Sequence, residues 1–135
     1  MTLPTPETFF REVERVFGFL VDHGFTIAER ESRPTYDCVV FLGRHVAVEI
    51  STDRRDECVD FAICKVVDGK SDVPRRNLFG YYVDRKGYRG GLKEFASDSA
   101  AARQDPFVAL LEMEARGLRE LAPEVVADRD DIFKE

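Results

Sequence analysis

The sequence contains few cysteines and histidines and no long apolar run. Three cysteines and two histidines occur among its 135 residues. An odd and small number of cysteines is typical of a reducing compartment rather than of a disulfide framework. No stretch reaches the roughly 18 consecutive apolar residues of a membrane span, and residues 1–11 lack the basic start and apolar run of a secretory signal. We therefore expect a cytoplasmic protein with no membrane span.

Length and composition are those of one ordinary globular domain. Apolar residues make up 44% of the chain and charged residues 34%, which is too apolar for a disordered protein. Acidic residues exceed basic ones by 26 to 20, which gives a formal charge of −6. A chain of this length can bury enough surface to fold without a metal or a disulfide. We therefore expect residues 1–135 to form a single domain.

Proline positions and apolar spacing indicate helices at both ends of the chain. Thr5-Pro6 and Asp105-Pro106 each resemble an N-cap followed by a proline at the first helical position. Apolar residues recur at helical spacing after both of them. The first pattern predicts a helix over residues 6–23, and the second predicts a helix over residues 106–122. A further helix is predicted over residues 92–103.

Between these helices the apolar period drops toward two, which is typical of strands. The connections are short, and short connections favour antiparallel hairpins. The expected fold class is therefore α+β, with an antiparallel 4–5-stranded meander sheet packed by an N-terminal amphipathic helix and C-terminal helices. The second strand has apolar residues on both faces, so we expect the tail, a loop or a partner to cover its second face. The predicted strands are residues 26–31, 36–42, 45–52 and 58–67, with a fifth at 78–84.

Two carboxylates in this meander have the spacing of a nuclease motif. Asp37 opens one predicted strand, and Glu49 lies on the next, two residues before Ser51. The pattern resembles the PD-(D/E)xK nuclease superfamily, in which the two acids hold a divalent metal and the lysine positions or activates water. The resemblance implies Asp37 and Glu49 as metal ligands, with Glu12 as an additional acid. Ser51 stands where the lysine belongs, so the pattern lacks the cation that would position or activate water. A divergent metal-dependent nuclease that uses Asp37 and Glu49 is therefore kept only as the alternative function.

The register of the hairpin decides whether these two carboxylates can meet. Gly43-Arg44 fits a two-residue type II′ turn, which pairs Asp37 with Ile50. Because side chains alternate between faces, this register sends Asp37 and Glu49 to opposite faces of the sheet. A three-residue turn would instead place Asp37 across from Glu49. The two-residue register gives the better apolar face, so we prefer it and expect no shared metal.

No other group of residues forms a recognisable site. Cys58 and Cys64 share a strand face but lie about 20 Å apart, so they can neither bond nor share a metal. His23 is predicted to cap a helix C-terminus, and His45 is predicted to begin a strand. The glycines of residues 87–91 lack the phosphate-loop signature. We therefore expect no catalytic residue, no metal and no cofactor, and interpret the cysteines as small buried hydrophobes.

Charge is unevenly distributed along the chain. Residues 70–93 contain seven Lys or Arg and two acids, a local charge of +5, with three tyrosines among them. Basic and aromatic residues together can bind single-stranded nucleic acid. The rest of the chain carries −11, however, which opposes a phosphate backbone. We therefore expect a solvated basic region rather than a nucleic-acid site, and the acidic remainder favours a basic protein partner.

The layout of the chain resembles a recurrent type of small bacterial protein. A Phe-Leu-x-x-x-Gly-Phe pattern at Phe19–Phe25 closes the first helix, an apolar strand pair follows, and a later helix leads to an acidic tail that carries a late phenylalanine, Phe133. Uncharacterised bacterial families and several immunity proteins of toxin–immunity systems are similar in this sense. The resemblance implies a non-enzymatic cytosolic protein that acts by binding, such as the immunity partner of a basic toxin domain. Candidate binding patches are Glu49 with His45 on the outer sheet face, and Asp128–Asp131 on the tail.

Overall fold

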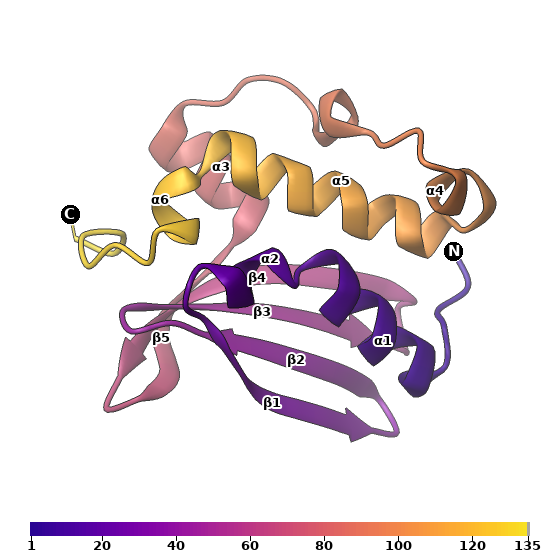
Figure 1. The fold of residues 1–135 in the computed structure, drawn as a ribbon, viewed down its shortest axis with the longest axis horizontal. Helices are drawn as coiled ribbons and strands as arrows, with labels where there is room; N and C mark the ends of the chain where they lie inside the picture. The colour runs from indigo at the N-terminus through magenta and orange to yellow at the C-terminus, as the bar shows by residue number, and fades with distance from the viewer. Residues whose placement is uncertain (135) are drawn as a thin grey trace.

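The computed structural model describes residues 1–134 and has two layers. A five-stranded antiparallel sheet forms one layer, and the helices of the described chain lie together over one of its faces (Figure 1). The predicted α+β fold class is thus confirmed. Within residues 1–134, no helix has the length and apolar character needed to span a membrane.

The sheet is a meander in which each strand pairs with the next one along the chain. Four strands confirm the prediction. The predicted fifth strand at 78–84 is wrong, because Asn77 accepts a hydrogen bond from the Gly80 N–H at 3.1 Å and caps a helix, α3, over Leu78–Lys86. This cap starts a helix among aromatic residues that otherwise favour a strand. The strands are β1 (Thr26–Arg33), β2 (Tyr36–Leu42), β3 (Val46–Asp53), β4 (Cys58–Val67) and β5 (Lys70–Asn77).

The first helix is interrupted near its end. It consists of α1 (Pro6–Val16) and α2 (Phe19–Asp22), so the continuous helix predicted over residues 6–23 is wrong. A Cβ at Gly18 would lie 2.9 Å from the Glu14 carbonyl oxygen. The backbone at the break is therefore too close to the preceding turn for any residue with a side chain. Phe17, at the break, is fully buried, and its ring centroid lies 6.0 Å from that of Phe61.

The helix predicted over residues 92–103 is also divided. It consists of a 3-10 turn, η1 (Leu92–Phe95), and a short helix, α4 (Ala100–Gln104). The Ser99 hydroxyl accepts a hydrogen bond from the Ala102 N–H at 3.0 Å and so starts α4 at Ala100 rather than at residue 92. The capping side chain of Ser99 therefore divides a segment whose sequence pattern predicts one continuous helix.

The predicted C-terminal helix is confirmed as α5 (Pro106–Leu121). Its predicted cap, Asp105, accepts a hydrogen bond from the Phe107 N–H at 2.9 Å. A single further turn, α6 (Pro123–Val126), follows. The main core lies between α1, α5 and one face of the sheet, where the rings of Phe9 and Phe107 pack with centroids 6.0 Å apart.

The second face of the sheet carries a smaller apolar cluster. Cys38, Val40, Ala47 and Cys64 are buried there, and Val66 packs against them. The pairing of β4 with β5 shifts after Cys64, and the end of this hairpin bends beneath the sheet toward β2 (Figure 1). The expected cover on the second face of β2 therefore comes from the β4–β5 hairpin.

Candidate functional site

Asp37 lies on the helix-covered face of the sheet and is fully buried. Its carboxylate accepts a hydrogen bond from Ser32 Oγ at 2.7 Å and pairs with the guanidinium of Arg54. The Asp37 N–H donates to Thr52 Oγ1 at 2.9 Å, and Arg54 also donates to the Pro4 carbonyl at 3.4 Å. These contacts form a partly buried ion pair that joins the end of the sheet to the residues before α1.

Glu49 lies on the other face of the sheet, opposite Val40. Its Oε2 atom accepts hydrogen bonds from Cys64 Sγ at 2.6 Å and from Ser71 Oγ at 2.7 Å. Ser71 belongs to the hairpin end that bends beneath the sheet, so Glu49 ties this hairpin to β3. The carboxylate predicted to be part of a free binding patch with His45 is thus engaged inside the fold.

The two carboxylates of the nuclease-like pattern cannot share a metal, because they lie on opposite faces of the sheet. The predicted faces are confirmed, but the predicted register is wrong by two residues. Asp37 faces Thr52 rather than Ile50, and the two-residue turn is Arg44-His45, closed by a 2.9 Å hydrogen bond from the Gly43 N–H to the Val46 carbonyl. A shift of two residues preserves the face of every side chain.

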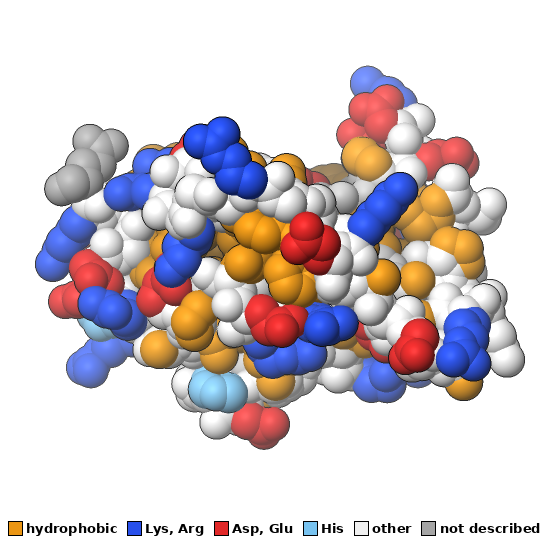
Figure 2. All heavy atoms as spheres, turned by 90° about the horizontal axis from the view of Figure 1, so that it is seen from above, with side chains coloured by type: hydrophobic (Ala, Val, Ile, Leu, Met, Phe, Trp, Pro, Cys, Tyr) orange, Lys and Arg blue, Asp and Glu red, His pale blue; other side chains and the backbone are white. Residues whose placement is uncertain are grey.

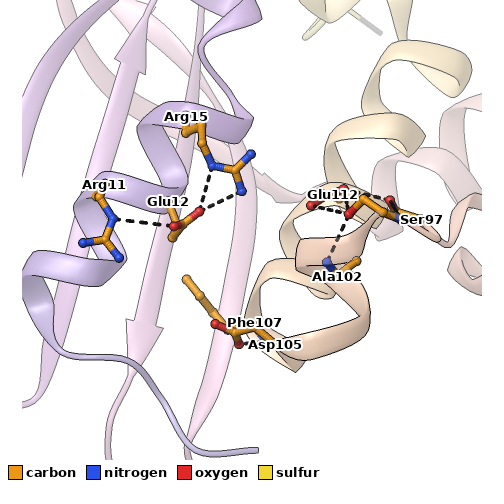
Figure 3. Close-up of polar contacts among 9 residues, drawn as sticks. Arg11, Glu12, Arg15, Ser97, Ala102, Asp105, Phe107 and Glu112 are labelled. Carbon is orange, nitrogen blue, oxygen red and sulfur yellow. Dashed lines mark hydrogen bonds and ion pairs between the residues drawn. The ribbon is translucent and has the colours of Figure 1, made fainter.

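The third acid of this pattern, Glu12, is also engaged. Arg15 Nη2 lies 2.7 Å from Glu12 Oε2, and Arg11 Nε lies 3.6 Å from Glu12 Oε1, both on the same helix (Figure 3). Among the residues that the structure describes, no three His, Cys, Asp or Glu side chains are grouped as a metal would need.

The tail aspartate Asp128 holds the turn between β2 and β3. Its carboxylate accepts hydrogen bonds from the backbone N–H groups of Arg44, His45 and Val46, at 2.5, 2.9 and 3.0 Å. Successive N–H groups converging on one anion form a nest. A Cβ at Gly43 would lie 2.6 Å from Asp128 Oδ1, so this approach requires glycine. Asp128, the first residue of the predicted tail patch, therefore binds the β2–β3 turn within the fold and is not free to bind a partner.

Much of the basic segment over residues 70–93 is paired within the fold. Arg75 Nη2 lies 2.7 Å from Asp60 Oδ2, and Lys86 Nζ lies 2.9 Å from Glu124 Oε2. Arg85 donates to the Lys134 carbonyl at 3.0 Å. All the cations of this segment except Arg76 are exposed, as predicted for a solvated basic region, and these three also anchor the sheet edge and the acidic tail.

A large hollow lies at the end of the sheet, beside the turns that join β1 to β2 and β3 to β4. It has a volume of about 600 Å³. Asp53, Asp56 and Asp60 line it, with Arg55 as the cation among its lining residues. Asp53 caps its own turn by accepting hydrogen bonds from the Arg55 and Asp56 N–H groups, at 2.9 and 3.2 Å. Asp56 is exposed, and so its carboxylate faces solvent.

The cysteines do not form a nucleophilic centre. Burial, together with the charge of Glu49, raises the pKa of both Cys38 and Cys64 to about 12, so their thiols stay protonated at neutral pH. Cys58 is exposed at the start of β4, which contradicts the expectation that the cysteines are buried. His23 caps α2 as predicted, with Nδ1 2.8 Å from the Phe19 carbonyl oxygen.

Sequence reasoning missed one buried acid, Glu114 on α5. Only 6% of Glu114 is exposed, and its Oε2 atom has no hydrogen-bond partner within residues 1–134. Burial, with a smaller contribution from the charge of Asp60, raises its pKa to about 7. The signal was present in the sequence, because Glu114 lies three residues after Leu111 and four before Leu118, on the buried stripe of the helix.

The fold and these contacts define an α+β domain, in which a five-stranded antiparallel meander is covered on one face by helices. Comparison with known proteins found no matching family model, no matching curated protein and no matching solved structure.

Proposed function

We propose that this chain is a non-enzymatic binding protein whose second sheet face receives a basic segment of a partner protein, in the manner of an immunity protein and its toxin. The observation that carries the proposal is a hollow of about 600 Å³ on a carboxylate-rich face that no helix of residues 1–134 covers. On this face, the strand registers align Glu29, Glu31, Glu49, Asp53 and Asp60 with the cations Arg33 and Arg75.

The charge on this face supports a basic partner. Carboxylates outnumber cations, and Glu29 and Asp56 are exposed. A field of one sign accelerates association with an oppositely charged protein and suppresses wrong partners. Seen from above the helices, by contrast, positive and negative side chains are interspersed with apolar patches (Figure 2). The helix layer therefore offers a basic partner less electrostatic attraction than the second sheet face.

A pair of charge-reversal variants tests this proposal. Glu29→Lys with Asp56→Lys changes the second face, and Asp22→Lys with Asp84→Lys makes the same charge change at exposed helix positions. Proteins captured from cells that produce the chain are identified by mass spectrometry, and each is then made in pure form and titrated. We expect a basic partner whose affinity falls about tenfold or more with the first variant and less than about twofold with the second.

Salt dependence provides the second criterion. Binding that depends on these carboxylates weakens when salt rises from about 50 mM to about 300 mM, because the ions screen exposed charges. An acidic partner, or a partner lost equally with both variants, contradicts the proposal.

A further inference from the structure

A second hollow, of about 380 Å³, lies in the helix layer between α1 and α5. Arg15 borders it from the last turn of α1, and Arg116 and Arg119 border it from α5. Ala115, which is buried, also lines it. Three guanidinium groups from two helices therefore surround one small space.

Two of these guanidinium groups are balanced by acids on their own helices. Arg15 Nη2 lies 2.7 Å from Glu12 Oε2, and Arg116 Nε lies 2.7 Å from Glu120 Oε2. Each guanidinium has five N–H donors and uses only some of them in these pairs. Arg15 and Arg116 can therefore still donate into the hollow, although their net charge is largely compensated.

Arg119 is different, because no carboxylate lies within 4 Å of it in the described part of the chain. Its guanidinium carbon instead lies 4.6 Å from the centre of the Phe19 ring. Stacking on an aromatic face orients a guanidinium and leaves the N–H groups at its edge free to bind an anion. Arg119 is thus a positioned cation without an acidic partner.

Two acids also border the hollow, and they limit the charge that it can accept. The Glu112 carboxylate accepts hydrogen bonds from Ser97 Oγ at 2.7 Å and from Ser99 Oγ at 2.8 Å (Figure 3). Asp98 is directed to solvent, and its carboxylate lies 3.8 Å from Arg103 Nη2. These negative charges favour a single anionic group, such as a carboxylate, over a phosphate dianion.

Arg119 also borders a neighbouring hollow of about 310 Å³. Its other lining residues are His23, Pro123, Val126 and Ala127, which are mainly apolar. A ligand whose anionic group binds Arg119 can therefore place an apolar group beside this wall. Small-molecule sites commonly combine an apolar lining with a few polar groups that fix orientation.

We propose that Arg119, with Arg116, binds the carboxylate of a small ligand whose apolar part lies against Pro123 and Val126. The site is in the helix layer and does not involve the sheet face assigned to the protein partner. Either proposal can therefore fail without the other.

Titration of ¹⁵N-labelled protein at constant ionic strength tests this site, with phenylacetate, acetate and inorganic phosphate as probes. We expect phenylacetate to shift the side-chain Nε–H signals of Arg116 and Arg119 in a saturable way. Acetate, which lacks the apolar group, is expected to bind about tenfold more weakly. Phosphate is expected to bind more weakly than phenylacetate, since Glu112 and Asp98 repel a dianion.

Variants separate a specific site from a general effect of charge. Arg119→Gln is expected to weaken phenylacetate binding about tenfold, and Arg119→Lys to restore only part of it, because lysine lacks the planar fork. Arg89→Gln removes the same charge from an exposed position and should leave the affinity within about twofold. Ala127→Glu, which adds a carboxylate to the apolar wall and can pair with Arg119, should also weaken binding. Equal affinity of wild type and Arg119→Gln, or phosphate binding as tight as phenylacetate binding, would overturn the proposal.

Discussion

Replacing Glu114 by glutamine removes the ionisable group from the buried face of α5. Burial raises the pKa of Glu114 to about 7, whereas the pKa of a glutamate in an unfolded chain is about 4.3. The folded protein therefore binds this proton more tightly than the unfolded chain does. Since the group is only 6% exposed and its Oε2 atom has no hydrogen-bond partner in the described residues, little solvent is present to stabilise its charge.

The direction of the pH effect follows from this difference in proton binding. Below the pKa of the unfolded chain, Glu114 is protonated in both states, so folding buries no charge at this residue. As the pH rises toward about 7, the unfolded chain loses the proton first, and the folded state loses stability relative to it. Above that pH the loss of stability stays at its full value, about 4 kcal/mol from the difference between the two pKa values. Glutamine cannot ionise and lacks this loss.

Urea unfolding of wild type and Glu114→Gln at several pH values measures the effect. We expect the free energy of unfolding of the variant, relative to wild type, to rise by about 3 kcal/mol between pH 5 and pH 8. The buried amide of glutamine lowers stability equally at every pH, so the slope isolates the ionisation. Glu120→Gln makes the same substitution at an exposed position on the same helix and is the matched control. A difference between wild type and Glu114→Gln that is constant across this pH range refutes the reasoning.

Three further predictions concern the internal contacts. Asp128→Ala removes the acceptor of three backbone N–H groups, so the free energy of unfolding should fall by about 2 kcal/mol in urea denaturation. Arg54→Ala leaves the fully buried Asp37 without its cation, and stability at neutral pH should fall by about 3 kcal/mol in the same assay. Iodoacetamide should label Cys58 at pH 8 in the native protein and leave the two buried cysteines unlabelled, as counted by mass spectrometry.

Matched controls and contrary outcomes accompany these variants. Asp130→Ala and Arg55→Ala remove the same charges at exposed neighbouring positions and should change stability by less than about 0.5 kcal/mol. If Asp128→Ala lowers the free energy of unfolding no more than Asp130→Ala does, the hydrogen bonds from the turn to Asp128 do not stabilise the fold. Equal effects of Arg54→Ala and Arg55→Ala would show that the ion pair with Asp37 contributes nothing. Native labelling of all three cysteines would contradict the burial of two of them.

Local signals in the sequence predicted most of the elements correctly. The caps Thr5 and Asp105 and the period-two pattern of the first four strands depend on neighbouring residues alone, so a single sequence reveals them. The fifth strand could not be found this way, because β5 is mostly exposed and rich in charges. Its apolar successor at residues 78–84 resembled a strand, whereas the Asn77 cap makes it helical.

Long-range contacts explain what sequence reasoning missed at the site. Gly43 was interpreted as a turn glycine, but it is required because Asp128 lies where its Cβ would be. Nothing in the neighbouring sequence indicates that a tail residue 85 positions away determines this turn. The pairing of Asp37 with Arg54 and the hollows beside Arg119 likewise depend on segments that meet only in the folded chain.

The exclusion of a shared metal depends on the face of each strand residue rather than on the exact register. The turn moves by one position along the chain, and the pairing moves by two residues, so Asp37 and Glu49 remain on opposite faces. A pairing shift of one residue would have brought the two carboxylates to one face and supported the nuclease alternative. Such a shift would also have turned Val48 and Ile50, both fully buried, away from the helices. The apolar alternation of β3 thus excludes the metal site more firmly than any property of the turn.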